Sequence, residues 1–301
     1  MEMRAYRGHQ DTEALAVFQS DALATGEHIG LMHAGDAVHR VESMYRRYDP
    51  RELVRIWEDE SGIGAWGFVS PRFSGFEIQV HPRRPDLQGE VVAWGYEATA
   101  AYIVENGLDL DRVIADGIVG YTARHDALDA EGFTKVGEDQ YIETDRLVEP
   151  LPEVTLPTGY RARTVYGPEE AELLANVHNG AFTAGFTAQD YADRMELPGY
   201  DPDREIVIEA PDGSLAAFTI VWFDRRNRIG LFEPVGVDSS HRRLGLGQAI
   251  MGLGLHRMAE EGMSTAWVTH SSSNGASAGL YAAAGFTPRF AVDDWVKLIE
   301  T

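Results

Sequence analysis

The fold of this chain is decided by one glycine-rich segment, Arg242-Arg243-Leu244-Gly245-Leu246-Gly247-Gln248-Ala249. A strand-like apolar run at 231–237 precedes it, and the helix-like run 250–253 follows. The first N–H groups of a helix have no partner within the helix, and the helix dipole adds partial positive charge there. Glycines let the backbone approach a ligand closely. The segment therefore predicts a cradle of main-chain donors for phosphate oxygens, with Arg242 and Arg243 as cationic partners.

Other phosphate-binding loops do not fit this segment. No Gly-Lys-Ser or Gly-Lys-Thr follows the glycines, which excludes the P-loop of nucleoside triphosphatases. Gly245-x-Gly247 is followed by Ala249-Ile250, so the dinucleotide pattern Gly-x-Gly-x-x-Gly is absent. A Gly-x-Gly pair by itself is also typical of a solvent loop. Here Arg242 three residues before Gly245, the preceding strand and a second motif downstream favour a functional loop.

The second motif is Asn274-Gly275-Ala276-Ser277-Ala278-Gly279-Leu280-Tyr281-Ala282-Ala283-Ala284-Gly285-Phe286. With this motif in place, the sequence resembles the GNAT superfamily of acetyl-CoA-dependent N-acyltransferases. The family loop, Arg/Gln-x-x-Gly-x-Gly/Ala, is matched in full by residues 242–247. The distal Asn, Leu-Tyr and Gly-Phe of the family fall on Asn274, Leu280-Tyr281 and Gly285-Phe286.

The resemblance implies an acetyl-CoA site. It implies that the strands at 231–237 and 264–270 splay apart and that pantetheine lies in the gap. A main-chain N–H near Val235 to Val237 then holds the acyl carbonyl as an oxyanion donor, the pyrophosphate lies on the loop, and Asn274 contacts the cofactor near the pantetheine. The expected acetyl-CoA-binding residues are Val235, Gly236, Val237, Arg242, Arg243, Leu244, Gly245, Leu246, Gly247, Gln248, Ala249 and Asn274.

The resemblance also makes Tyr281 the general acid that protonates the leaving CoA thiolate. The alternative for Tyr281 is a core aromatic, because Leu280-Tyr281 lies on a short apolar helix. Without the loop upstream, the core position would be the preferred interpretation. The loop shifts the prediction to catalysis.

Glu233 is the candidate general base. It lies two residues before Val235, and the period of two in a strand would place both on one face, although Pro234 indicates a bulge between them. The alternative for Glu233 is a surface or salt-bridged strand residue. His178 and His270 are alternative bases, but a lone histidine near a strand end is more often structural.

The two halves of the chain share landmarks. Gly132-Phe133-Thr134 recurs 153 residues later as Gly285-Phe286-Thr287, and a common order of strands and helices accompanies this repeat. The fold class predicted is mixed α/β, as two tandem GNAT-fold domains, a layout that resembles mycothiol synthase-like proteins. Three prolines in 149–159 can continue neither a helix nor a central strand. We therefore predict a degenerate N-terminal GNAT-like domain at 1–149, a Pro-rich linker at 150–159 and a C-terminal GNAT domain with the acetyl-CoA site at 160–301.

The first half lacks the features of the site. Its equivalent segment, 81–90, has no Gly-x-Gly, and Asp86 and Glu90 lie where phosphates would bind and satisfy the helix dipole themselves. The offset of 153 places Leu128 opposite Tyr281, and leucine has no proton to give. We expect this half neither to bind CoA well nor to catalyse, but to pack against the second half and shape the acceptor cleft.

Composition limits the remaining function classes. The chain has 26 Lys and Arg against 48 Asp and Glu, a net charge of −22 that repels nucleic acid and anionic lipid, so neither is expected as a partner. The acidic surplus favours either a cationic amine acceptor or simply solubility. The absence of cysteine removes a thioester intermediate on the enzyme, so the acceptor is expected to attack directly. No metal-ligand spacing occurs, so no metal is expected.

The predicted function is transfer of an acetyl or short acyl group from acetyl-CoA to a small-molecule or peptide amine. The alternatives are a catalytically silent acyl-CoA-binding regulatory or interaction protein, and transfer to an oxygen or sulfur acceptor. The segments 26–48 and 183–203 are expected to set the acceptor. With no apolar run of about 20 residues and a charged N-terminus, the chain is expected in the cytoplasm, as a monomer or homodimer.

Overall fold

The computed structural model describes residues 1–137, 140–182 and 184–299. The first half contains β1 (Glu2–Ala5), α1 (His9–Leu23), α2 (Ala34–Met44), α3 (Pro50–Leu53), β2 (Val54–Asp59), β3 (Gly62–Ser70), β4 (Gly75–Val80), α4 (Gln88–Glu105), β5 (Arg112–Ile118), α5 (Thr122–Glu131), β6 (Thr134–Lys135) and β7 (Tyr141–Leu147). The second half contains β8 (Arg161–Thr164), α6 (Ala171–Phe182), α7 (Ala188–Met195), β9 (Glu205–Glu209), β10 (Leu215–Asp224), β11 (Ile229–Val237), α8 (Leu246–Glu260), β12 (Thr265–Ser271), α9 (Gly275–Ala283) and β13 (Thr287–Leu298).

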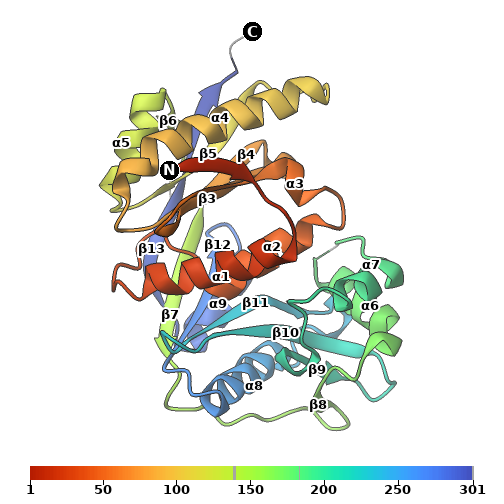
Figure 1. Ribbon diagram of the computed structural model, residues 1–301. Coiled ribbons are helices and arrows are strands. Elements are labelled where there is room, and N and C mark those ends of the chain that lie inside the picture. The colour runs from red at the N-terminus through yellow and green to blue at the C-terminus, as the bar shows by residue number, and fades with distance from the viewer. Residues whose placement is uncertain (138–139, 183, 300–301) are drawn as a thin grey trace.

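These strands form one mixed sheet in the order β1-β2-β3-β4-β5-β13-β7-β12-β11-β10-β9-β8. Its two ends belong to two lobes, each with helices packed on its strands (Figure 1). The mixed α/β class and the tandem arrangement predicted from the sequence are confirmed. The predicted strand at 138–147 includes residues 138–139, which lie outside the described residues.

The last strand of each half pairs with the other half, which the sequence did not predict. β13 ends the chain but pairs with β5 of the first lobe, and β7 precedes the linker but pairs with β12 of the second lobe. β7 and β13 also pair with each other. The exchange joins the two sheets edge to edge, so neither lobe leaves an open strand edge at the junction.

Helices α1 and α2 lie between the two lobes (Figure 1). α2 packs closely on β10, since a Cβ added to Gly35 would lie 2.4 Å from the Cβ of Trp222. His33 Nε2 lies 3.0 Å from the carbonyl oxygen of Ile229, a buried hydrogen bond between the lobes. One hydrophobic cluster includes side chains of both halves: Ala22, Leu23, Leu31, Ile220, Trp222, Ile229, Leu231 and Trp267.

The segments 26–48 and 183–203, which are expected to set the acceptor, contain the helices α2 and α7. α7 begins with a capping box in which Thr187 Oγ1 accepts the N–H of Asp190 and the Asp190 carboxylate accepts the N–H of Thr187. Thr183 lies outside the described residues. Helices of 11 and 8 residues are too short to be stable by themselves, so packing stabilises them: α2 packs on α1 and on β10 of the other lobe, and α7 packs on α6.

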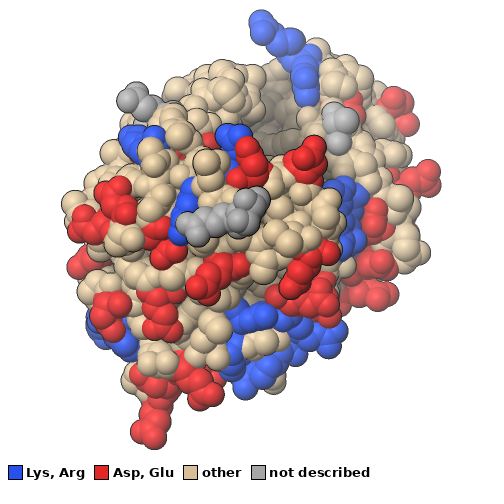
Figure 2. Space-filling view, turned by 90° about the horizontal axis from the view of Figure 1, so that it is seen from above, with Lys and Arg blue, Asp and Glu red and all other residues tan. Residues whose placement is uncertain are grey.

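Surface charge is distributed unevenly over the face in Figure 2. Acidic side chains are spread across it, basic side chains form smaller groups, and one edge is hollowed. Among the described helices, none is both long and apolar enough to cross a membrane. Within the described ranges, no group of three or more His, Asp or Glu side chains is placed to hold a metal ion.

Candidate active site

The glycine-rich segment forms a tight turn at the N-terminus of α8. Arg243 and Gly245 both have left-handed backbone, with φ of 67° and 81°, and Gly245 is the N-cap residue. No side chain caps the helix, so its first N–H groups remain available to a ligand. A Cβ on Gly247 would lie 3.1 Å from Leu280, so the backbone here lies close to α9. This turn fits a pyrophosphate group.

The side chains of the loop leave this cradle open. Arg242 and Arg243 are exposed, and Arg242 donates to the carbonyl oxygen of Ala181 at 3.3 Å. Gln248 donates to the carbonyl oxygen of Leu280 at 3.0 Å. Leu244 is exposed, whereas Leu246 and Ala249 are buried in the core of the second lobe.

A left-handed glycine at the N-cap gives a stability prediction. Gly245→Ala should lower the free energy of unfolding by about 1–2 kcal/mol, because an L side chain at this φ is strained. The matched control is Gly89→Ala, at the start of α4 in the first half, where φ is not positive and an added Cβ meets nothing within 4 Å. That variant should be unchanged or more stable by up to about 1 kcal/mol. Urea unfolding measures both, and equal responses would contradict the strained turn.

Strands β11 and β12 diverge just before the loop. Their parallel pairing covers Ile229–Leu231 with Thr265–Trp267 and ends there. On the other side of β11, the register with β10 shifts between Thr219 and Val221, which places a bulge at Glu233-Pro234, as the sequence predicts. The Trp222 indole N–H donates to the Glu233 carbonyl oxygen at 2.8 Å. The divergence leaves Val235–Val237 beside a gap in the sheet.

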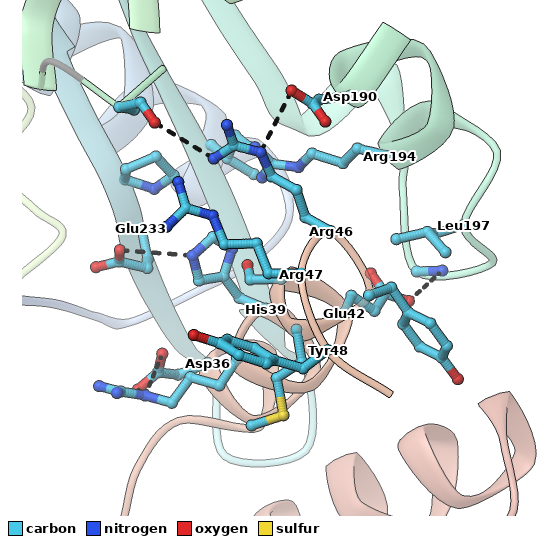
Figure 3. Close-up of a pocket in the computed structure, with 18 of the residues that line it drawn as sticks. Asp36, His39, Glu42, Arg46, Arg47, Tyr48, Asp190, Arg194, Leu197 and Glu233 are labelled. Atoms are coloured by element: carbon cyan, nitrogen blue, oxygen red, sulfur yellow. Dashed lines mark hydrogen bonds and ion pairs between the residues drawn. The ribbon is translucent and has the colours of Figure 1, made fainter. Parts of the chain in front are cut away.

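A cavity of about 660 Å³ lies between the two halves (Figure 3). Residues of α2 and the chain after it line one side, and residues of α6, α7 and 197–204 line the other. Glu233 and Pro234 of the β11 bulge also line it. The segments expected to set the acceptor, 26–48 and 183–203, therefore contribute much of its wall. Glu233 thus connects this cavity to the strand that leads into the glycine-rich loop.

The environment of Glu233 suits a base at neutral pH. About 35% of its side chain is exposed, and this surface opens into the cavity. Burial raises the pKa of Glu233 to about 7, the nearby charge of Asp36 adds to the rise, and Arg40 opposes it. His39 Nε2 lies 3.8 Å from Glu233 Oε1, and burial lowers the pKa of His39 well below its ordinary value. His39 is therefore a neutral neighbour at neutral pH.

Tyr281 lies on α9 with its ring in the hydrophobic core of the second lobe. The ring centre lies 5.9 Å from that of His270 and 6.2 Å from that of Phe286. Burial raises the pKa of the Tyr281 phenol above its ordinary value, and the charge of Glu233 adds to the rise. The phenol therefore stays protonated at neutral pH. Within the described part of the chain, its hydroxyl makes no hydrogen bond.

The remaining candidate residues lie in other positions. Asn274 is the N-cap of α9, where its side-chain oxygen accepts the N–H of Ser277 at 3.2 Å. His270 lies at the end of β12 with Nδ1 3.0 Å from the carbonyl oxygen of Ser271. His178 is buried and stacks on Phe218 with ring centres 3.8 Å apart.

His178 also belongs to a buried polar chain that the sequence did not reveal. The Tyr191 hydroxyl lies 3.1 Å from His178 Nε2 and donates to Glu205. Burial lowers the pKa of His178, while the hydrogen bond with Glu205 opposes that change. These contacts fasten α6 and α7 to β9, which positions one wall of the cavity.

In the first lobe a buried arginine fills the equivalent gap between strands. Like β11 and β12, the parallel strands β4 and β5 pair only briefly, in this case over two residues each. Beyond that point the Arg124 guanidinium donates to the carbonyl oxygens of Ile78 and Asp116, at 3.1 and 3.4 Å, and to Gln88 Oε1 at 2.8 Å. Leu128 is fully buried nearby in the core of this lobe. The first gap is closed by the protein's own side chains.

The diverging strands and the uncapped glycine turn are features of the GNAT fold. The chain belongs to the acetyltransferase (GNAT) family, whose family model matches residues 171–286. It is 31% identical over 217 residues to the mycothiol acetyltransferase of Streptomyces griseus, covering 70% of this chain and 67% of that protein. It is 32% identical over 170 residues to the mycothiol acetyltransferase of Thermomonospora curvata. That second match covers 54% of this chain and just over half, 56%, of the relative.

Two solved structures share the fold along the whole chain. One is a tandem GNAT protein from the clavulanic acid biosynthesis pathway, with a TM-score of 0.66 at 14% identity, covering 100% of this chain and 99% of that one. The other is a GCN5-related N-acetyltransferase from Sphaerobacter thermophilus, with a TM-score of 0.65 at 19% identity, covering 100% and 96%. At these identities the likeness concerns the fold alone.

Proposed function

We propose that this protein transfers an acetyl group from acetyl-CoA to an amine held in the cavity between its lobes. The observation that carries the proposal is the position of Glu233. It lines the cavity, has a pKa raised to about 7, and lies on the strand that leads into the glycine turn. A base at this point would lie between the acceptor in the cavity and the thioester of acetyl-CoA.

In the proposed reaction, the ammonium of the acceptor first loses a proton to the Glu233 carboxylate. The free amine then attacks the thioester carbonyl carbon, and a main-chain N–H within Val235–Val237 stabilises the oxyanion. The attacking nitrogen then loses its second proton to solvent, and Glu233 releases the first proton there as well. Collapse of the tetrahedral intermediate breaks the C–S bond and expels the CoA thiolate. Tyr281 donates its phenolic proton to that sulfur, and solvent returns the proton to Tyr281. The products are an amide and CoA thiol.

We further propose a division of labour between the lobes. The C-terminal domain, 160–301, carries the acetyl-CoA site, and the N-terminal domain, 1–149, is a degenerate copy joined to it by the linker at 150–159. Support comes from Arg124, which fills the gap in the first lobe, and from Leu128 at the position opposite Tyr281. Two relatives are named mycothiol acetyltransferases, which supports a small molecule as the acceptor.

The test of this function is ligand-induced stabilisation followed by turnover. Acetyl-CoA at 100 times its Kd should stabilise the protein by about 2.7 kcal/mol, measured as a rise in Tm. Desulfo-CoA, which keeps the pyrophosphate, should give a similar shift. A panel of amines should then release CoA thiol from acetyl-CoA in proportion to N-acetylated product. The absence of any shift with acetyl-CoA would contradict the proposal.

A further inference from the structure

The cavity between the lobes is lined by both acidic and basic side chains. Of the six arginines that line it, three are paired with carboxylates of the protein, and two more, Arg47 and Arg72, are exposed. Arg40 contacts Asp36 at 3.2 Å and Glu77 at 2.6 Å. Arg46 lies 3.4 Å from Asp190 and also donates to the main chain at Ala184 and Gly185. These guanidinium groups have carboxylate partners and need no ligand.

Arg204 is engaged in the same way. Its guanidinium lies 3.5 Å from Asp201 and 4.2 Å from the centre of the Trp222 ring, and it donates to the carbonyl oxygen of Gly199. Like Arg40 and Arg46, it makes structural contacts. Removal of any of these three arginines would leave a carboxylate unpaired.

Arg194 differs from the other three. It is partly buried, lines the cavity, and extends into it from α7 in Figure 3. No carboxylate of the described residues lies within 4.0 Å of its side-chain nitrogens, and those residues offer it no hydrogen bond. Its guanidinium carbon lies 5.5 Å from the centre of the Tyr191 ring. A cation in such a position has donors left for a ligand.

The charge of Arg194 reaches the candidate catalytic groups. Burial raises the pKa of Glu233, and the positive charge of Arg194 opposes that rise. Burial lowers the pKa of the neighbouring His39, and Arg194 adds to that fall. Arg194 therefore lies within electrostatic range of the proposed base. Arg47 also lines the cavity, but it is exposed at the rim, where solvent screens its charge. The cavity therefore combines one candidate base with one partly buried arginine that has no described carboxylate within 4.0 Å.

We propose that the acceptor is an amine that also carries an anionic oxyacid group, a carboxylate or a phosphate, which binds to Arg194 while the amine faces Glu233. This inference rests on the proposed function. Net charge favoured either a cationic amine acceptor or simply solubility, and it gave no indication of an anionic group on the acceptor. The planar guanidinium binds two oxygens of a carboxylate or a phosphate with two parallel hydrogen bonds, a geometry that ammonium cannot reproduce.

The experiment compares acceptors in matched pairs. Amino acids are tested against their carboxamides, and phosphoethanolamine against ethanolamine, with thiol release measured from saturating acetyl-CoA. In the wild type, one anionic series should have kcat/KM about tenfold or more above its neutral partners. The measurement is made well above the pKa of Glu233, so that this carboxylate is deprotonated in both proteins. There Arg194→Gln should raise KM for the anionic acceptors by about ten- to a hundredfold, with kcat and the KM of neutral acceptors changing little. The series that responds identifies carboxylate or phosphate.

Two further variants separate recognition from a structural or general charge effect. Arg194→Lys keeps the positive charge but loses the two parallel hydrogen bonds of the guanidinium, and it should keep only part of the affinity for anionic acceptors. Arg47→Gln removes an equal charge from the rim and should leave the selectivity unchanged. An equal loss for neutral and anionic acceptors in Arg194→Gln, or an equal loss of selectivity in Arg47→Gln, would overturn the proposal. If no amine of either kind is acetylated, although acetyl-CoA binds, then the proposed function itself fails.

Discussion

Replacing Glu233 by Gln should lower kcat/KM for acetyl transfer by about 10²- to 10⁴-fold, the range by which a positioned general base accelerates proton transfer. Glutamine is nearly isosteric and lines the cavity equally well, but it cannot accept the ammonium proton. Acetyl-CoA binds on the far side of the β11 bulge in the proposed reaction. Its affinity, measured by the thermal shift, should therefore stay within about twofold of the wild type.

The pH profile gives the sharper form of this prediction. Glu233 works as a base only when it is deprotonated, and burial raises its pKa to about 7. Below that value the active fraction falls about tenfold per pH unit, so kcat should rise through pH 7 and then level off. Arg40 on α2 and Arg194 on α7 oppose the rise in pKa, whereas Asp36 and Glu143 add to it. Glu233→Gln should lose this rise of kcat through pH 7. Comparing the pH profiles of the two enzymes separates the titration of Glu233 from that of the acceptor.

Asp193→Asn is the matched control for Glu233→Gln. Asp193 also lines the cavity, but it is exposed at the end of α7. The variant removes one carboxylate of the same wall and should keep both the rate and the limb near pH 7. A Glu233→Gln enzyme with the wild-type rate and profile would exclude Glu233 as the base and return attention to His178 and His270.

The features that the sequence predicted are those set by local chemistry. Gly245 takes a left-handed φ that other residues avoid, and Pro234 interrupts the ladder of β11, so the turn and the bulge can be inferred from a few neighbouring residues. The repeat at an offset of 153 predicted the order of elements in both halves for the same reason. Each copy carries its own periodicity and turn residues.

The features that the sequence did not predict depend on contacts between distant residues. In the exchange of β7 and β13, strands more than 100 residues apart in the sequence become neighbours. The residue patterns of β7 and β13 would be equally compatible with pairing inside their own lobes. Arg124 fills the gap in the first lobe through Ile78 and Gln88, 46 and 36 residues away. The missing Gly-x-Gly predicts that the first half is a degenerate copy, but only the fold reveals that the Arg124 side chain fills the gap between its strands.

Arg194 shows the same limit at the site itself. Its sequence context, the last turn of a short polar helix, suggests an ordinary surface residue favoured by the helix dipole. Its significance depends on three other arginines of the cavity having carboxylate partners while it has none among the described residues. That difference is a property of the assembled cavity. Specificity is therefore expected to depend on α2 and α7, which lie outside the motifs that identify the family.

Replacing Tyr281 by Phe should lower kcat by about 10²-fold or more while the Kd of acetyl-CoA stays within about twofold. The CoA thiolate needs a proton as the C–S bond breaks, and Tyr281 keeps its phenolic proton at neutral pH because burial raises its pKa. Its ring packs in the core, but its hydroxyl has no hydrogen-bond partner among the described residues. Phenylalanine therefore keeps the packing and leaves no group unsatisfied, so the variant should fold with nearly unchanged stability.

The control for this substitution is Tyr160→Phe. The Tyr160 hydroxyl lies 2.9 Å from His241 Nδ1, next to the glycine turn, so this variant loses a hydrogen bond that exists in the protein. It should lose some stability, about 0.5–1.5 kcal/mol, but keep its turnover. Tyr281→Phe should do the reverse, because its hydroxyl acts in the reaction and not in folding. Wild-type turnover in Tyr281→Phe would assign the residue to the core alone and require another donor for the thiolate.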